Sequence, residues 1–255
     1  MPAAGNGSNN WAVGPEKSAT GHSILANDTH LGLTLPNIWY ENQLSCPEFN
    51  VYGVALISVP GIINGFNSEV AWGPTNGTTD ALDYYETEFE DESSLKYRFH
   101  GRLEAAEVKR ETVLVRGGDP LSVDVIWTKL GVLMHREGRY GLVANWMGHR
   151  PGLELKAVRG LYAAKTAAQC LDSFTDWFVP LQNFICADRG RVSILHAGRV
   201  PRREIGEGRF IMDGQFAKDP FASTQPSPRI DNAPVVFSGQ PKILGPIRGR
   251  IGLGL

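Results

Sequence analysis

The chain has 255 residues, of which 42% are hydrophobic and 20% are charged, and its formal net charge is −2. This composition is typical of a folded globular protein with an ordinary core. There is no basic surplus of the kind that favours nucleic-acid binding, and no apolar run approaches the roughly 18 residues of a membrane-spanning helix. We therefore expect neither nucleic acid nor a membrane as a partner.

The start of the chain, MPAAGNGSNN, contains neither a basic stretch nor an apolar stretch, so we predict no signal peptide within it. The three cysteines, Cys46, Cys170 and Cys186, lie far apart and form no metal-binding spacing. An odd number of cysteines does not indicate a disulfide framework. We therefore expect them to be buried, unpaired side chains.

Short apolar runs separated by Gly and Pro predict a chain rich in strands. The strands are expected near residues 11–13, 23–26, 51–59, 69–72, 84–92, 110–116, 122–127, 141–146, 183–187 and 191–197. The continuous run at 51–59 predicts a strand buried on both faces. Turn residues at 117–120 and 188–190 predict two hairpins. The one expected helix covers about 165–179, where apolar residues recur every three to four positions before Pro180.

The most informative motif begins at Ser8, which follows Gly7. The stretch SNNWAVGPEK leads from Ser8 towards the element Asn27-Asp28-Thr29-His30. This stretch resembles the start of the mature β-subunit in the penicillin acylase family of N-terminal-nucleophile hydrolases. In that family a precursor is cut autocatalytically before a serine. Thr29 departs from the proline that the family commonly has at this place.

The resemblance continues through two later blocks. Residues 65–76 match the family's G-x-N-x-x-x-x-W-G-x-T segment, and residues 182–203 match its Q-N-x-x-x-A-D-x-x-G…G-x-x-P-x-R block. The resemblance implies three parts: residues 1–7 as a spacer remnant, 8–205 as the β-subunit core, and 206–255 as a divergent, weakly structured tail. It also implies an α+β fold, the αββα sandwich, present here as a β-rich incomplete portion.

The chemistry explains why a serine must stand at the cleavage point. A serine hydroxyl is a weak nucleophile until a base takes its proton. An N-terminal serine carries such a base, because a free α-amine has a pKa of about 7.7–8.0. That amine exists only after the Gly7–Ser8 bond is cut. Gly7 suits this bond because a residue without a Cβ can adopt strained angles that let the Ser8 hydroxyl reach its carbonyl.

The family resemblance assigns further residues to the site. The backbone N–H of Asn76 is expected to be an oxyanion donor, and His30 is expected beside Ser8, where it would tune the amine or hold the oxyanion region. The second donor of the family, a downstream Asn side chain, has no counterpart, since Asn232 lacks the surrounding pattern. The positions that line the acyl pocket in the family are Leu31, Tyr40, Ile63 and Asn64.

Asp80 and Asp83, with the carbonyl of Leu82, match a calcium site of many family members. Oxygen ligands of this kind suit a hard cation such as Ca²⁺. The family completes that site with a glutamate from an α-subunit cut from the same precursor, which is the expected partner chain. Calcium is expected only in the complete protein, and the chemistry itself requires no cofactor. Family members generally act in the periplasm or as secreted proteins.

The implied reaction is hydrolysis of a linear amide, in which an acyl group passes from a small N-acyl amine to Ser8 and then to water. The sequence does not choose among penicillins, cephalosporins, acyl-homoserine lactones and other N-acyl amines. Two alternatives stay open. One is an inactive acylase fragment that lacks the α-subunit and the second oxyanion Asn. The other is an unrelated β-rich binding module, which leaves Gly7–Ser8 and the block at 183–203 without an explanation.

Overall fold

The structure, a computed structural model, describes residues 7–77, 79–203, 208–218, 224–225 and 229–239. The chain forms two compact units. Unit 1 comprises residues 1–79, 152–199 and 226–255, and unit 2 comprises residues 80–151 and 200–225. The predicted 8–205 core is thus divided between both units. Within the described ranges, no helix has the length and apolar character that crossing a membrane requires.

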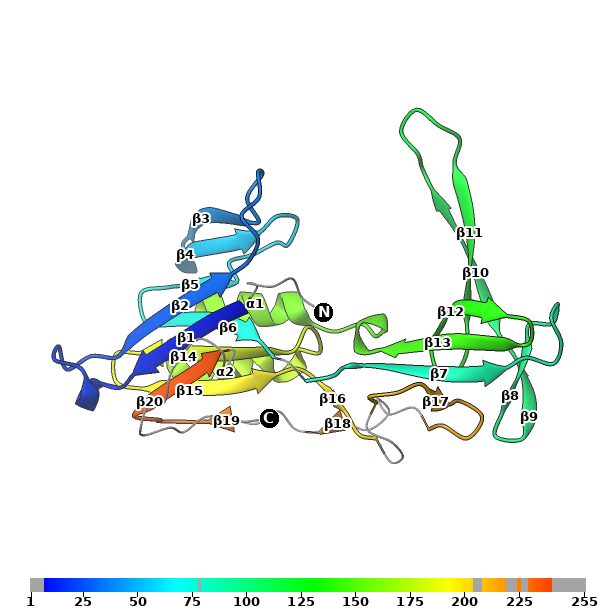
Figure 1. The fold of residues 1–255 in the computed structure, drawn as a ribbon. Helices are drawn as coiled ribbons and strands as arrows, with labels where there is room; N and C mark the ends of the chain where they lie inside the picture. The colour runs from blue at the N-terminus through cyan, green and yellow to red at the C-terminus, as the bar shows by residue number, and fades with distance from the viewer. Residues whose placement is uncertain (1–6, 78, 204–207, 219–223, 226–228, 240–255) are drawn as a thin grey trace. The chain divides into compact units, whose positions relative to one another are not determined.

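The described part of unit 1 contains two sheets and two α-helices, labelled in Figure 1. The small sheet is built from β1 (Gly7–Val13), β2 (Ile24–His30) and β20 (Val235–Gly239), in the order β2-β1-β20. The large sheet is built from β3 (Trp39–Cys46), β4 (Phe49–Leu56), β5 (Asn64–Phe66), β6 (Val70–Asn76), β14 (Gln182–Asp188), β15 (Val192–Ala197) and β19 (Arg229–Ile230). Its order is β19-β15-β14-β6-β5-β4-β3. The helices are α1 (Glu154–Ala163) and α2 (Ala167–Asp172), with 3-10 turns η1 (Pro15–Lys17) and η3 (Ser173–Asp176).

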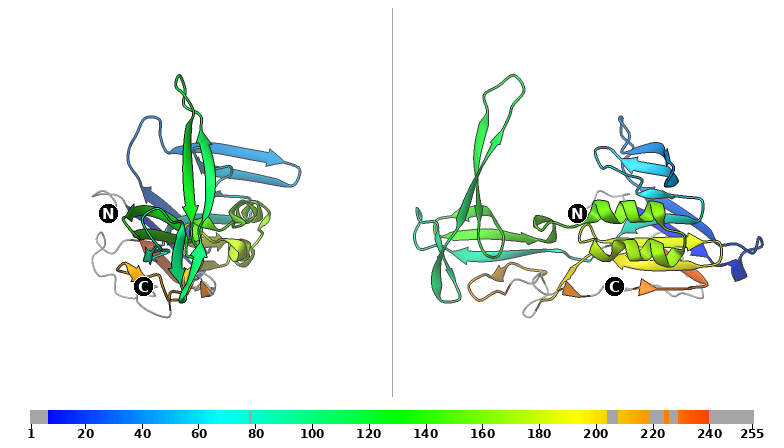
Figure 2. Two further views of the ribbon diagram at one scale, coloured as in Figure 1. Left: turned by 90° about the vertical axis from the view of Figure 1, so that its right-hand side faces the viewer. Right: turned by 180° about the vertical axis from the view of Figure 1, so that it is seen from behind.

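The elements of unit 1 form three layers, and a hydrophobic core fills the space between each layer and the next. One core joins the helical segments to a face of the large sheet, and its members include Leu161, Leu171, Phe174, Trp72 and Phe184. The other core joins the two sheets, and its members include Ala12, Val236, Ile185 and Ile194. Figure 2 shows α1 and α2 covering the face of β14 and β15 that is turned away from β1. The described part of unit 1 is therefore a helix–sheet–sheet arrangement.

The alternation of side chains along β14 and β15 decides which residues face the small sheet. Phe184 belongs to the helix-side core and Ile185 to the core between the sheets. Since successive strand residues point to opposite faces, Asn183 points towards the small sheet. Ile194 of β15 also belongs to the core between the sheets, so His196, two residues later, points the same way.

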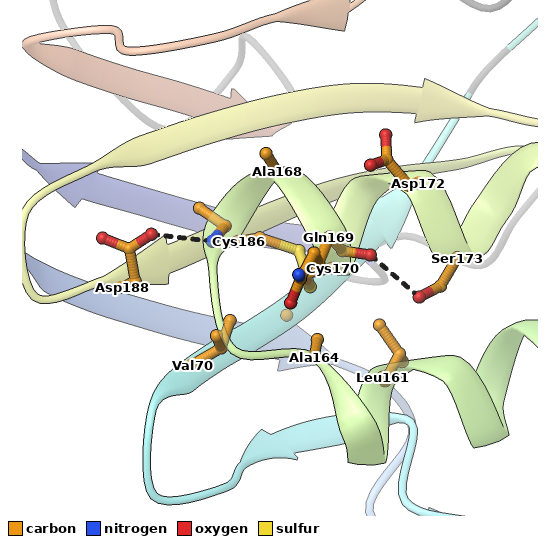
Figure 3. The surroundings of a disulfide bond; sticks show 12 residues. Val70, Leu161, Ala164, Ala168, Gln169, Cys170, Asp172, Ser173, Cys186 and Asp188 are labelled. Carbon is orange, nitrogen blue, oxygen red and sulfur yellow. Dashed lines mark hydrogen bonds between the residues drawn. A yellow bond between two sulfur atoms is a disulfide. The ribbon is translucent and has the colours of Figure 1, made fainter.

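A disulfide bond joins Cys170 of α2 to Cys186 of β14 (Figure 3). The Ala167 N–H, at the start of α2, donates a hydrogen bond of 2.8 Å to the Asp188 carboxylate. Cys170 and Cys186 are buried as expected but are paired, while Cys46 is unpaired as expected but is exposed. The pairing has no signature in the spacing, because the two sulfurs meet only when α2 packs on β14.

Unit 2 is built around a six-stranded sheet. Its strands are β7 (Leu82–Glu88), β10 (Glu107–Val113), β11 (Leu121–Trp127), β12 (Val132–Glu137), β13 (Tyr140–Trp146) and β17 (Met212–Asp213), in the order β10-β11-β12-β13-β7-β17. The pairs β8 (Lys96–Phe99) with β9 (Arg102–Ala105) and β16 (Val200–Pro201) with β18 (Thr224–Gln225) complete it, together with the 3-10 turn η2 (Met147–His149).

The predicted hairpins β10–β11 and β14–β15 are confirmed. The prediction for residues 51–59 is wrong in one respect, because along β4 buried residues alternate with more exposed ones, so only one face is fully covered. In the segment after residue 205, β19 pairs with β15 and β20 pairs with β1. These parts of the expected tail are therefore integral to the two sheets, while residues 240–255 lie outside the described residues.

Candidate active site

Ser8 lies in β1 with its side chain on the inner face of the small sheet. Burial alternates along β1, and Ser8, Asn10 and Ala12 are its buried residues, at 7%, 0% and 0% exposure. Ala12 is part of the core between the sheets, so Ser8 points towards the large sheet. Its hydroxyl donates a hydrogen bond of 2.6 Å to the Gly7 carbonyl. The hydroxyl of the predicted nucleophile therefore already contacts the carbonyl of the bond that would be cut.

Asn10 ties the strand of Ser8 to the large sheet. Its Nδ2 donates to the carbonyl oxygen of Gly73 at 2.9 Å and approaches that of Asn183 at 3.5 Å. Gly73 belongs to β6, three residues before Asn76, and Asn183 belongs to β14. A Cβ at Gly73 would lie 2.6 Å from the Asn27 side chain, so the glycine lets β2 approach closely. The strand of Ser8 is thus held against the strand that ends at Asn76.

The register of β6 shows whether its neighbouring strands use the backbone N–H of Asn76, the predicted oxyanion donor. Asn76 faces Gln182 in the register with β14, and the Gly77 N–H donates to the Leu181 carbonyl at 2.8 Å. This pattern makes Asn76 and Gln182 a pair that exchanges no backbone hydrogen bonds. On its other side, β6 pairs with β5 only at Ala71 and Trp72. In the described ladders, neither neighbouring strand uses the Asn76 N–H.

Three polar side chains form a network next to Asn76. Asn183 Nδ2 donates to the Asn76 carbonyl at 3.4 Å, and Asn183 Oδ1 lies 2.6 Å from His196 Nδ1. His196 Nε2 lies 3.1 Å from Thr79 Oγ1. Burial lowers the pKa of His196 below its ordinary value. The inter-sheet space therefore changes from an apolar core around Ala12 to a polar group around Asn183.

The structure does not bring the His30 imidazole to Ser8. The His30 backbone lies opposite Gly7, and Thr29 lies opposite Ser8. Residues directly opposite one another in an antiparallel pair share a face, so Thr29 shares the face of Ser8 and His30 lies on the other face. There its Nε2 contacts the exposed Asp28 carboxylate at 2.9 Å.

The predicted pocket residues lie in different surroundings. Tyr40 lines a groove formed by β3, β4 and the turn at 57–62, and this groove includes none of Leu31, Ile63 and Asn64 in its lining. Ile63 is buried in the core beneath α1, and Asn64 pairs with Val54 at the start of β5. The described residues of this chain alone therefore do not form one acyl pocket from these four positions.

The predicted calcium ligands are taken up by an arginine. Arg203 donates from Nε to both oxygens of the fully buried Asp83, at 2.9 and 3.2 Å. It also donates from a terminal nitrogen to the carbonyl of Asp80 at 3.2 Å. Among the described residues, no group of three or more His, Cys, Asp or Glu side chains gathers as a metal site. In this arrangement Asp80 and Asp83 bind Arg203 rather than a calcium ion, and calcium binding at Asp80, Leu82 and Asp83 stays a prediction.

Sequence comparison decides the family. The family model described as penicillin amidase matches residues 1–252. The chain belongs to the penicillin amidase family. The match extends past Arg203 and so includes the segment in which we found no family motif.

Relatives of this penicillin amidase family member are acylases. An acyl-homoserine lactone acylase QuiP from Pseudomonas aeruginosa is 29% identical over 233 residues, which cover 84% of this chain and 28% of the relative. Penicillin acylase 2 proenzyme from Pseudomonas sp. strain SE83 is 31% identical over 206 residues, covering 79% of this chain and 26% of the relative. The chain thus spans little more than a quarter of the length of these relatives.

The fold agrees with that of a solved family member. A thermostable penicillin G acylase from Alcaligenes faecalis superposes with a TM-score of 0.80 at 22% identity, covering 95% of this chain and 45% of that chain. At this level of identity the likeness concerns the fold.

The sequence assigned no role to Asn10, Asn183 or His196. Asn10 and Asn183 lie within stretches that resemble the family, but their contacts follow from the packing of two sheets, which a sequence motif does not show. The sequence signal that could have found them is a polar residue at a strand position whose alternation predicts that it faces the core.

Proposed function

We propose that this chain carries the nucleophile of an acylase, and that cleavage of the Gly7–Ser8 bond releases Ser8 as an N-terminal residue. The observation that carries the proposal is the buried Ser8 hydroxyl, which contacts the Gly7 carbonyl at 2.6 Å on a strand held against β6. Membership of the penicillin amidase family supports it. Gly7 and Ser8 are then the cleavage site, and Ser8 is the catalytic residue.

The proposed maturation begins with attack of Ser8 Oγ on the carbonyl carbon of Gly7. The C–N bond between Gly7 and Ser8 breaks, the nitrogen takes up the proton that Oγ loses, and an ester joins Gly7 to Oγ. Water then hydrolyses this ester, leaving a carboxylate on Gly7 and a free amine on Ser8. That amine has a pKa suited to a base near neutral pH.

The mature Ser8 would act on a linear amide. With its proton taken by the α-amine, Oγ attacks the carbonyl of an N-acyl amine, the amine leaves, and water releases the acyl group. The Asn76 N–H is the proposed donor to the oxygen that becomes negative. In its favour, neither neighbouring strand occupies this N–H in the described ladders. His30, whose side chain lies on the opposite face from Ser8, receives no role in this step.

A second subunit from the same precursor is the proposed partner. The relative named as a proenzyme supports this proposal. The segment after β2 presents Leu33 and Leu35 almost fully exposed, at 102% and 99%, beside a groove that Tyr40 lines. Exposed apolar side chains of this kind favour contact with another protein surface. The partner would complete the acyl pocket and contribute the remaining helix layer of the αββα sandwich.

The proposed compartment lies outside the cytoplasm. The supporting observation is the Cys170–Cys186 disulfide. Such bonds persist mainly in oxidising compartments.

Labelling with phenylmethanesulfonyl fluoride tests the proposed nucleophile. The reagent should modify Ser8 and should leave the Ser8→Ala variant unmodified, as read by peptide mass spectrometry. Ser18, a partly exposed serine of the same unit, is the matched control, and Ser18→Ala should be labelled like the parent chain. Absence of label at Ser8, with the chain folded and its N-terminus processed, would indicate a catalytically inactive fragment instead.

A further inference from the structure

His196 is a buried ionisable side chain. The chemistry proposed for Ser8 does not use it. It is 2% exposed on the inner face of β15, the face that looks towards the strand of Ser8. Both of its ring nitrogens have partners, Asn183 Oδ1 at 2.6 Å and Thr79 Oγ1 at 3.1 Å. Buried polar groups are normally hydrogen-bonded, and both partners of this ring lie beside Asn76: Asn183 donates to the Asn76 carbonyl and Thr79 stands three residues after Asn76.

The hydrogen bonds fix which nitrogen of His196 carries the proton. Asn183 Nδ2 donates to the Asn76 carbonyl, so Asn183 Oδ1 is the acceptor atom that faces His196. His196 therefore donates from Nδ1, and Nε2 of the neutral ring accepts from the Thr79 hydroxyl. The amide of Asn183 is thereby held in the orientation in which its Nδ2 faces Asn76.

The same ring also packs against the chain directly after Asn76. A Cβ at Gly77 would lie 2.5 Å from His196 Cε1 and 3.0 Å from the backbone of Leu181. Only glycine fits between the ring and the neighbouring strand at this separation. His196 thus contacts the segment that follows β6 at Gly77 and at Thr79, and through Asn183 it reaches the carbonyl of Asn76.

We propose that His196 is a positioning residue that, through Asn183 and Thr79, fixes the Asn76–Gly77 peptide and hence the place of the Asn76 N–H relative to Ser8. This inference rests on the proposed roles of Ser8 and Asn76. It assigns to His196, a residue outside β6, the positioning of the Asn76 N–H as the proposed oxyanion donor. An oxyanion donor displaced by about 1 Å is expected to slow the reaction by up to about 100-fold.

Two variants of His196 separate positioning from packing. In His196→Asn, the side-chain Nδ2 stands as far along the chain as the imidazole Nδ1 and can still donate to Asn183. In His196→Leu, a side chain of similar bulk has no donor. Leu195→Val is the control, because Leu195 lies on the opposite face of β15 in the helix-side core and its truncation lowers stability without touching the network.

The full chain, labelled with ¹⁵N, gives the first readout. The His196 ring should show a protonated Nδ1 and an unprotonated Nε2 near neutral pH. The exchange rate of the Gly77 amide should rise about 10-fold in His196→Leu relative to Leu195→Val, and should stay within about 3-fold of the parent in His196→Asn. Thr79→Val, which removes only the Nε2 partner, takes the place of His196→Leu if that variant does not fold. It should shift the Nε2 resonance and raise the exchange rate of the Gly77 amide.

The second readout is the rate of Ser8 labelling by phenylmethanesulfonyl fluoride, which should fall about 10- to 100-fold in His196→Leu and recover in His196→Asn. Equal Gly77 exchange in His196→Leu and Leu195→Val would overturn the inference, as would a ring protonated on Nε2 alone. If Ser8 in the parent chain is never labelled, the proposed function fails, while Gly77 exchange still decides whether His196 holds this peptide.

Discussion

Asn10 Nδ2 donates a hydrogen bond of 2.9 Å to the carbonyl of Gly73, and this bond joins the strand of Ser8 to the strand that ends at Asn76. Asn10 stands two residues after Ser8, and Gly73 stands three residues before Asn76. The separation of Ser8 and Asn76, the proposed nucleophile and the proposed oxyanion donor, therefore depends on this side chain.

Replacing Asn10 by alanine should both destabilise unit 1 and slow maturation. Asn10 is fully buried, so its loss leaves the Gly73 carbonyl without this donor, at an expected cost of about 1–3 kcal/mol. Urea denaturation measures the cost, and the rate of loss of residues 1–7 measures maturation. Asn50→Ala on the exposed side of β4 is the control and should change stability by less than about 0.5 kcal/mol. An Asn10→Ala chain that matures at the parent rate would show that Ser8 does not need this contact.

The Cys170–Cys186 bond should contribute measurably to stability. The two cysteines are separated by 16 residues in sequence, and closing a loop of about this length in the unfolded chain is worth about 3 kcal/mol. Cys186→Ser should therefore lower the free energy of unfolding by about 3 kcal/mol, and reductant should have the same effect on the parent chain. Cys46→Ser, which removes the exposed free thiol, should change little. A parent chain insensitive to reductant would contradict the contribution.

Much of the strand content follows from the sequence, because turns are local. The residues 117–120 and 188–190 predict their hairpins correctly, since Gly and Asp at a turn act within a few residues. The helix expected at 165–179 is in fact α2 followed by the short turn η3, and α1 was not predicted. The buried face of α1 is formed by Ala157, Val158, Leu161 and Tyr162, a helical spacing that Gly160 and the preceding Pro151-Gly152 obscure.

The residues of the candidate site also fall into two groups: those that local sequence motifs predict and those that depend on long-range strand pairing. Gly7, Ser8 and Asn76 follow from motifs of adjacent residues. The network of Asn183 and His196 depends on the register between β14 and β15, which places these two residues opposite one another. The side of β2 on which His30 lies depends on its register with β1. These long-range pairings are settled by packing, so the sequence alone did not reveal them.

Arg203 should govern how unit 2 responds to calcium. Asp83 is fully buried and is paired with the guanidinium of Arg203. Arg203→Met leaves this carboxylate without its partner and should cost about 3–5 kcal/mol. Since Arg203 already neutralises Asp83, excess Ca²⁺ should leave the thermal midpoint of the parent chain unchanged. Calorimetry with Ca²⁺ and with a chelator tests this, and a rise of several degrees with Ca²⁺ would show that the ion displaces Arg203.

His196 should make unit 1 less stable in mild acid. Burial holds the pKa of His196 below its ordinary value of 6.5, so the unfolded chain takes up a proton at a pH where the folded chain does not. The stability that the neutral ring provides is complete above about pH 6.5 and is lost as the pH falls through the folded pKa. Chemical denaturation between pH 7 and pH 5 should show a smaller loss in His196→Asn than in the parent chain. Equal losses in both would mean that His196 does not titrate differently on folding.

The most direct test of whether Ser8 is the nucleophile that cleaves the Gly7–Ser8 bond is the intact mass of the expressed chain, followed over time. The parent chain and Ser8→Cys, which keeps a nucleophile at this position, should lose the mass of residues 1–7, and Ser8→Ala should keep it. An unchanged mass in all three chains, or equal cleavage in Ser8→Ala, would contradict the account.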